Sequence, residues 1–426
     1  MQLSKQQKAW AYYDVGNSSY QLVIVTAIFP IYYAAVCPEN ISLFGSVWSK
    51  ASFYLMLFSM SYLFIGIANP LLSGIADFSM ARKKFMIGFT ITGIIGTLML
   101  CLFDSNHLEI GFMGTFLSTV GYAGSMVFYN AYLPEIAKEE DQDLLSARGY
   151  AWGYLSSMIL LVIALIPFVF GLLDSELASK LTFLLVSIWW AFFSFYSISR
   201  LPKDALSIKS NRNMIVGGYI ELFSAMKKVY SQKRLSLFLA SFFFYMMGVQ
   251  TVFYAATLFG KQELKLDDNL LIVTMLLIQL LGAIGANVLS KLARHKGNFI
   301  ALSITIVIWA GVTVFAYLMQ SAVEFIIASI FVGFVMGGIQ SLSRSTYSKW
   351  TYKLKDKASL FSLLDFTEKI GIVIGTMAFA YFTDLFGSMR EAILLLAGFF
   401  LVGLILLICS NQLKGMALIH LEQVWN

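Results

Sequence analysis

Long continuous runs of apolar residues, separated by short polar segments, are the dominant pattern along the chain. A helix of about 20 apolar residues spans a hydrocarbon core about 30 Å thick. The runs do not alternate apolar and polar positions, which favours helices over a transmembrane barrel. We predict twelve spans near residues 15–36, 51–76, 85–104, 109–135, 148–173, 180–200, 236–260, 268–290, 299–319, 324–348, 358–383 and 387–411.

The overall composition supports a membrane protein. Hydrophobic residues make up 58% of the 426 residues and charged residues only 13%, whereas a soluble domain carries about 25% charged residues. The net charge of +6 does not indicate nucleic-acid binding, because the basic residues lie in short segments between the apolar runs. We therefore expect an all-α protein embedded in a lipid bilayer, without a nucleic-acid partner.

The distribution of Lys and Arg predicts the orientation of the chain. With the N-terminus inside, 24 of the 30 basic residues fall on the inner side, five fall outside and Lys369 lies within a span. This asymmetry predicts that both termini are cytoplasmic.

The longest polar segment lies at the middle of the chain. We predict two six-helix halves, at residues 1–200 and 236–426, joined by a cytoplasmic linker at 201–235. The basic residues of this linker are suited to holding it against anionic lipid.

Several motifs resemble the vacuole-effluxer-like family of the major facilitator superfamily, in its bacterial form. The matching segments are WAYYDVGNSSY at 10–20, PLLSGIAD at 70–77 with RKK at 82–84, YNAYLPE at 129–135, SARGYAWGY at 146–154 and GIQSLSRS at 338–345. The resemblance implies the major facilitator fold, alternating access and, for the fungal members, export of amino acids from the vacuole. It also implies a cytoplasmic latch made of Asp77, Arg82 and Lys83. The chain departs from the superfamily pattern at Met80 and Ala81, where a Gly usually precedes the basic pair.

Charged residues inside the predicted spans are the first group of candidate functional residues. A charge near the bilayer centre costs at least about 2.5–3.5 kcal/mol, so each needs a partner or a function. One interpretation is a polar pocket or protonation site, and the other is a set of ion pairs that closes the cytoplasmic side. For Asp365 and Lys369 the spacing of four favours an ion pair within one helix, while both interpretations stay open for Glu368. The candidate coupling or gating charges are Asp14, Glu135, Arg148, Arg344, Asp365, Glu368 and Lys369.

Uncharged polar side chains in the spans are the second group, and we predict that they contact the substrate. They can bind a polar solute without the desolvation cost of a buried charge. The alternative is that they form hydrogen bonds between helices, which small residues at 282–287 would also bring close together. The candidates are Asn17, Ser18, Gln21, Asn130, Gln250, Tyr254 and Gln340.

These features predict a secondary transporter that moves a small polar solute by alternating access. The finer expectations are amino-acid export and proton coupling, with a sugar, peptide or amphiphile as alternative substrates. A membrane sensor or a membrane-embedded enzyme is the alternative of another class, but the chain shows neither a long soluble segment nor a concentrated His, Asp or Ser constellation. We expect a multi-pass protein of the plasma membrane that is a monomer and no enzyme, with no cofactor or metal and with the solute, protons and lipid as partners.

Overall fold

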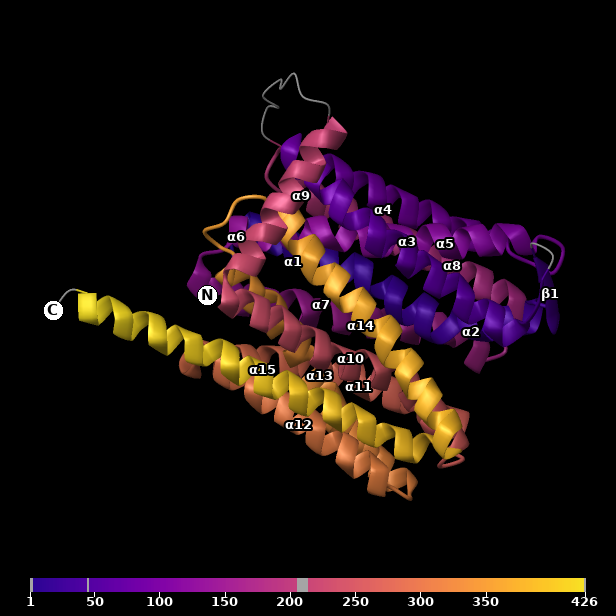
Figure 1. The fold of residues 1–426 in the computed structure, drawn as a ribbon. Helices are drawn as coiled ribbons and strands as arrows, with labels where there is room; N and C mark the ends of the chain where they lie inside the picture. The colour runs from indigo at the N-terminus through magenta and orange to yellow at the C-terminus, as the bar shows by residue number, and fades with distance from the viewer. Residues whose placement is uncertain (1–2, 44–45, 205–213, 425–426) are drawn as a thin grey trace. The chain divides into compact units, whose positions relative to one another are not determined.

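The computed structural model describes residues 3–43, 46–204 and 214–424, and these form a helical protein with one small hairpin (Figure 1). The chain divides into two compact units. Unit 1 consists of Met1–Ile136 and Trp152–Tyr219, and unit 2 consists of Ala137–Ala151 and Ile220–Asn426. Residues 205–213 of the predicted linker lie outside the described part of the chain.

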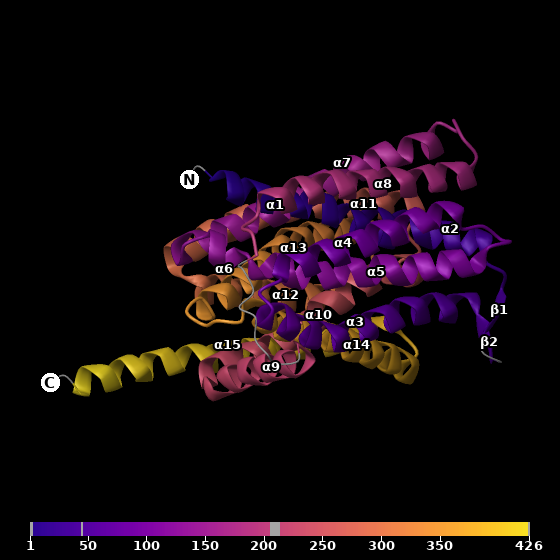
Figure 2. The same ribbon diagram turned by 90° about the horizontal axis from the view of Figure 1, so that it is seen from above.

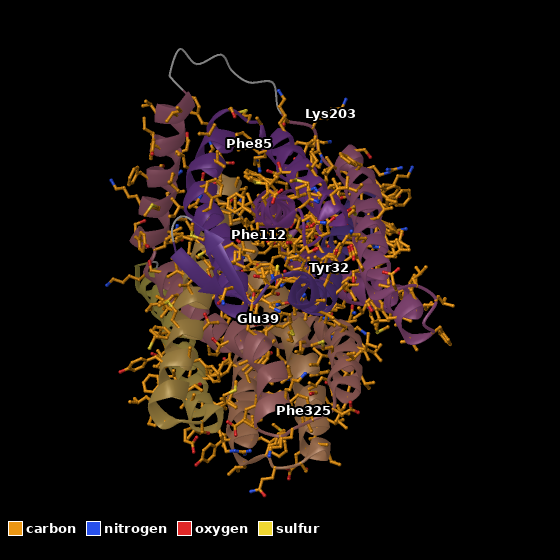
Figure 3. All side chains as sticks on the ribbon, turned by 90° about the vertical axis from the view of Figure 1, so that its right-hand side faces the viewer. Tyr32, Glu39, Phe85, Phe112, Lys203 and Phe325 are labelled. Carbon is orange, nitrogen blue, oxygen red and sulfur yellow. The ribbon has the colours of Figure 1, made fainter. Side chains whose placement is uncertain are left out.

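Unit 1 holds the N-terminal helices and the hairpin. In chain order these elements are α1 (Lys5–Ser19), the π-helix η1 (Tyr20–Ile28), α2 (Phe29–Val36), β1 (Asn40–Leu43), β2 (Ser46–Ser49), α3 (Lys50–Phe78), α4 (Arg82–Met99), the short 3-10 helix η2 (Leu100–Leu102), α5 (Leu108–Ala131), α6 (Leu133–Ile136) and α8 (Ser175–Arg200). The strands β1 and β2 pair antiparallel, with Asn40 opposite Ser49. Figure 3 looks at the molecule from the hairpin end, where Tyr32 and Glu39 are labelled.

Unit 2 holds the C-terminal helices. They are the 3-10 helix η3 (Glu139–Asp141), α10 (Lys233–Gln262), α11 (Asp268–Lys296), α12 (Asn298–Leu318), α13 (Ala322–Trp350), α14 (Lys357–Phe386) and α15 (Met389–Val424). Two helices cross the boundary between the units, namely α7 (Gln142–Val169) and α9 (Met214–Ser231). Within unit 2, α15 extends beyond the other helices (Figure 2).

Eleven helices within the described residues are long and apolar enough to cross a membrane. They correspond to the predicted spans except the one at 358–383. That segment does form a helix of 30 residues, α14, but it carries Asp365, Glu368 and Lys369 and is not among the eleven. The helical membrane architecture is therefore confirmed, and the count of twelve spans is consistent with the structure.

The two units pack their helices in the same order. In unit 1, α1 packs against α8, α4 packs against both α5 and α8, and α3 packs against α5. In unit 2, α10 packs against α15, α12 packs against both α13 and α15, and α11 packs against α13. These four contacts recur in both units, as expected of a fold built from two parallel repeats.

Glycines bring α11 and α13 into close contact, as the small residues at 282–287 predicted. A Cβ atom on Gly285 would lie 1.8 Å from the backbone oxygen of Phe334, and one on Gly337 would lie 2.0 Å from the oxygen of Gly282. Small residues let two helix backbones approach closely. Because the hydrophobic effect does not drive helices together within lipid, the van der Waals contacts formed in this way stabilise their association.

Replacing Gly285 with Ala should therefore force α11 and α13 apart. We expect a loss of about 1–3 kcal/mol in stability, seen as a lower melting temperature of the detergent-solubilised protein. The matched control is Gly311→Ala, because a Cβ at this helical position of α12 meets no atom within 4 Å. Equal melting temperatures for the two variants would contradict the assigned packing.

Candidate functional site

A buried aromatic and carboxylate cluster lies where α1 meets α5 in unit 1. The Asp14 side chain is only 2% exposed, and the Tyr129 hydroxyl donates a hydrogen bond of 2.7 Å to its Oδ2 atom. The Trp10 ring stacks on Tyr129 with 4.5 Å between centroids, and its Nε1 donates to the Tyr129 carbonyl oxygen at 2.9 Å. The structure thus gives Asp14 a neutral hydroxyl partner, fixed by stacking.

The first span changes helix type beside the other polar candidates of α1. Asn17 is buried, and its Nδ2 donates to the Met126 sulfur at 2.8 Å. The π-helix η1 begins at Tyr20, so Gln21 lies in a wider turn than a continuous α-helix would provide. Pro30 lies just after this segment. Proline has no backbone N–H to donate to the carbonyl oxygen four residues earlier, and this missing hydrogen bond commonly distorts a helix. Turns of π-helix frequently occur at functional sites.

Ser18 and Asn130 complete the substrate candidates of unit 1. A Cβ on Gly153 of α7 would lie 2.4 Å from the Ser18 hydroxyl oxygen, so the two helices approach closely there. Asn130 is half-buried, one residue before the end of α5. Ser18 therefore lies at a helix contact, which is the alternative role that the sequence left open.

The residues predicted to form the latch lie together at the junction of α3 and α4. The Nε atom of Arg82 lies 3.5 Å from the Asp77 carboxylate, and its Nη1 also pairs with Glu135. Lys83 donates from its Nζ to the Leu201 carbonyl oxygen at 3.0 Å. Glu135, predicted separately as a gating charge, therefore belongs to the same cluster as Asp77 and Arg82.

The turn that carries this cluster is built around Met80. Its φ of 50° lies in the left-handed region that favours glycine. The Ala81 amide donates to the Ala76 carbonyl oxygen at 2.9 Å, which closes the turn. The turn thus has a left-handed residue that is not glycine.

Unit 2 holds the charged residues of α14. Lys369 Nζ lies 3.4 Å from Asp365 Oδ1, and both side chains are 12% exposed. The Gln250 amide of α10 donates to Glu368 Oε1 at 2.7 Å. The ion pair predicted from the spacing of four is present, and Glu368 has an uncharged partner on a neighbouring helix. Tyr254, one turn beyond Gln250, is 36% exposed.

Arg344 of α13 is buried against the first turns of α7. It is 3% exposed and donates to the Ser146 hydroxyl at 2.9 Å and to the Ser146 carbonyl oxygen at 2.8 Å. Its guanidinium also lies 4.2 Å from the centre of the Tyr150 ring. Gln340 and Arg148 are both half-buried, on α13 and α7 respectively.

A second buried ion pair was not predicted from the sequence. Lys349 Nζ lies 2.5 Å from Asp143 Oδ2, and Asn298 joins the two by donating to Asp143 Oδ1 at 2.6 Å and accepting from Lys349 at 2.9 Å. Asp143 and Lys349 both lie just outside the predicted spans at 148–173 and 324–348. The two residues are 206 positions apart in the chain, so no spacing within one helix links them. In the structure α7 begins at Gln142, six residues before Arg148.

A cavity of about 90 Å³ inside unit 2 has an apolar lining that includes Val252, Phe259, Met275 and Phe325. The Thr274 hydroxyl in its wall donates to a carbonyl of its own helix. This cavity therefore offers little for a polar solute, and the polar clusters are the better candidate site.

A helical membrane protein with two similarly packed units and charges within its spans has the features of the major facilitator class. A family profile described as vacuole effluxer Atg22-like matches residues 3–419. The chain belongs to this family, which confirms the resemblance seen in the sequence.

Individual relatives agree with this assignment. The chain is similar to the uncharacterized MFS-type transporter YxiO of Bacillus subtilis, with 29% identity over 95% of this chain and 94% of the relative. It is also similar to autophagy-related protein 22 of Saccharomyces cerevisiae strain S288c, with 24% identity over 86% of this chain and 79% of that protein.

Solved structures show the same fold. The fucose:proton symporter FucP of E. coli matches with a TM-score of 0.71 at 13% identity, covering 95% of this chain and 97% of that one. The human organic anion transporter MFSD10 matches with a TM-score of 0.71 at 12% identity, covering 94% and 98%. Family and fold together identify a multi-pass membrane transporter of the major facilitator type and not an enzyme.

Breaking the buried Asp143–Lys349 pair should destabilise the protein more than breaking an exposed pair. We expect Asp143→Asn to cost about 3 kcal/mol, because it leaves the Lys349 charge uncompensated, and to lower the melting temperature. Glu176→Gln is the matched control, because the Glu176–Lys180 pair at 2.7 Å has a 54% exposed carboxylate and such pairs contribute under about 1 kcal/mol. Partial recovery of the melting temperature in the double variant Asp143→Asn, Lys349→Met would support the pairing, and equal effects of the two carboxylate variants would contradict it.

Proposed function

We propose that this transporter exports a small zwitterionic solute, with an amino acid as the substrate class, and that protons drive the export. The observation that carries the proposal is the set of charges of both signs on α14, together with the Gln250–Glu368 hydrogen bond of 2.7 Å. We further propose that it acts in the plasma membrane as a monomer, with both termini in the cytoplasm.

The position of these charges along α14 supports a role in transport. The helix runs from Lys357 to Phe386, so at 1.5 Å per residue Lys369 lies about 4 Å from its midpoint and Asp365 about 10 Å. Charges so deep in a span are costly and usually mark a pathway for substrate, ions or protons. Asp365 and Lys369 offset each other as an ion pair, whereas Glu368 adds a further negative charge.

A zwitterion suits groups of both signs. Its ammonium group needs acceptors such as a carboxylate, and its carboxylate needs donors such as an ammonium or an amide. The remaining substrate candidates are uncharged, namely Asn17, Ser18, Gln21 and Asn130 in unit 1 and Gln250, Tyr254 and Gln340 in unit 2. The description of the matching family as vacuole effluxer-like supports export as the direction.

The substrate class can be tested by counterflow in liposomes that contain the purified protein. Liposomes loaded with an unlabelled neutral amino acid should accumulate the same labelled amino acid, while sugars and cationic amphiphiles should not show counterflow. A protein that elutes as a folded monomer but exchanges only a sugar or an amphiphile would contradict the amino-acid assignment.

Glu368 is the residue that we propose to carry the coupling proton. Protonation removes its charge within the span, and the uncharged Gln250 amide can remain in contact with both forms. Replacing Glu368 with Gln should abolish proton-driven accumulation, because the amide cannot exchange the proton. Counterflow in the absence of a pH gradient should persist.

The measurement is uptake of the labelled amino acid with and without an imposed pH gradient. Glu324→Gln is the matched control, because Glu324 lies in the first turn of α13 and accepts hydrogen bonds from Gln320 and Ser321 amides, which a Gln side chain can also do. Stimulation by the pH gradient that survives Glu368→Gln would refute the assignment of the proton to this residue.

A further inference from the structure

The helix α9 presents large apolar side chains on its exposed face, although it is not among the eleven described helices that are long and apolar enough to cross a membrane. The Phe223 side chain is 62% exposed and Tyr230 is 67% exposed. These residues recur at spacings of three, four and seven, which places them on one side of the helix. The members of this exposed apolar face are Ile215, Val216, Tyr219, Ile220, Phe223 and Tyr230.

The opposite side of α9 already packs against the protein. Leu222, Ala225 and Val229 are buried and lie on a separate stripe. Ser224 and Lys228 lie between the buried stripe and the exposed apolar face, and both are half-buried. The helix therefore has two apolar sides, and within the described part of the chain only one of them is covered.

Two contacts place α9 level with the ends of membrane-spanning helices. At its start, a Cβ on Gly218 would lie 2.5 Å from the Ile75 side chain, and one on Gly217 would lie 2.6 Å from the Phe78 ring, at the end of α3. Near its other end, Lys228 Nζ lies 2.7 Å from Oδ2 of Asp356, the residue before α14. In the topology predicted from the basic residues, both contacts lie on the side of the membrane that carries the linker.

The charge of this part of the chain indicates what kind of surface contacts the exposed apolar face of α9. The chain from 200 to 234 holds eight Lys and Arg residues against two acidic residues, Asp204 and Glu221. Lys227 is exposed and lies at the margin of the apolar face. An amphipathic helix with exposed aromatic residues and a basic margin has the properties of one that lies in a bilayer interface, and Tyr prefers that depth.

We propose that α9 is an interfacial helix that binds anionic lipid on the linker side of the membrane. Tyr219, Phe223 and Tyr230 insert toward the acyl chains, and Lys227 lies among the headgroups. With 18 residues and a rise of 1.5 Å per residue, the helix covers about 27 Å of the interface. The chain between the sixth and seventh spanning helices is then a lipid-binding element as well as a linker.

The immersion of the exposed face can be measured with spin labels at two adjacent positions. Phe223→Cys and Ser224→Cys are labelled in a background that carries Cys101→Ser and Cys409→Ser, because Cys37 is buried. In lipid nanodiscs, the label at 223 should collide more with oxygen than with a water-soluble nickel complex, and the label at 224 should show the reverse. Equal access of the nickel complex to both labels would overturn the proposal, as would protection of position 223 from both reagents, which indicates a protein partner.

The lipid class is tested by comparing nanodiscs of phosphatidylcholine with nanodiscs that also contain phosphatidylglycerol. Anionic lipid should increase the immersed fraction of the label at 223. Lys227→Gln should reduce that increase about fivefold, because one basic residue near an anionic surface contributes about 1 kcal/mol of binding free energy. Lys353→Gln is the matched control, because Lys353 is exposed on another segment of the same side. Immersion that does not differ between the two bilayers would overturn the assignment to anionic lipid.

Discussion

The hydrocarbon core of a bilayer contains no water, so each polar group within it needs a partner supplied by the protein. The backbone meets this requirement by forming helices. Several hydroxyl side chains meet it by donating hydrogen bonds to carbonyl oxygens of their own helix. Thr90, Thr97 and Thr305 each donate to the carbonyl four residues earlier, at 2.7 to 2.9 Å. Side chains that carry a charge need partners from another turn or another helix, and Asp14, Glu368 and Arg344 each have a partner on another helix.

This requirement explains which features could be predicted from the sequence. The spans could be predicted from long apolar runs, and the family from contiguous motifs. The Asp365–Lys369 ion pair could be predicted from the spacing of four residues within one helix. The partners of Asp14, Glu368 and Arg344 come from residues far away in the chain, at Tyr129, Gln250 and Ser146. One sequence alone contains no local signal for such contacts.

The hydrophobic pattern of the sequence could also not predict where a helix changes type or which apolar side chains are exposed. The apolar run at 15–36 has the same composition in an α-helix or a π-helix, so the change at Tyr20 could not be predicted. The basic residues of the linker are visible in the sequence. The exposed apolar face of α9 is visible only in the structure, which shows that Leu222 and Val229 are buried while Phe223 and Tyr230 are exposed. Periodicity shows that a helix has an apolar side, and packing shows whether the protein covers it.

The two units share one packing order but differ in how they hold charge. In unit 1, Asp14 is paired with a neutral hydroxyl, and the pairs of Arg82 lie at the helix ends. In unit 2, α14 holds an ion pair and a further carboxylate near the middle of the helix. A charge at a helix end can reach the polar interface, whereas a charge near the middle of a span needs partners from the protein. The charged side chains of α14 therefore depend on partners within the protein more than Arg82 does.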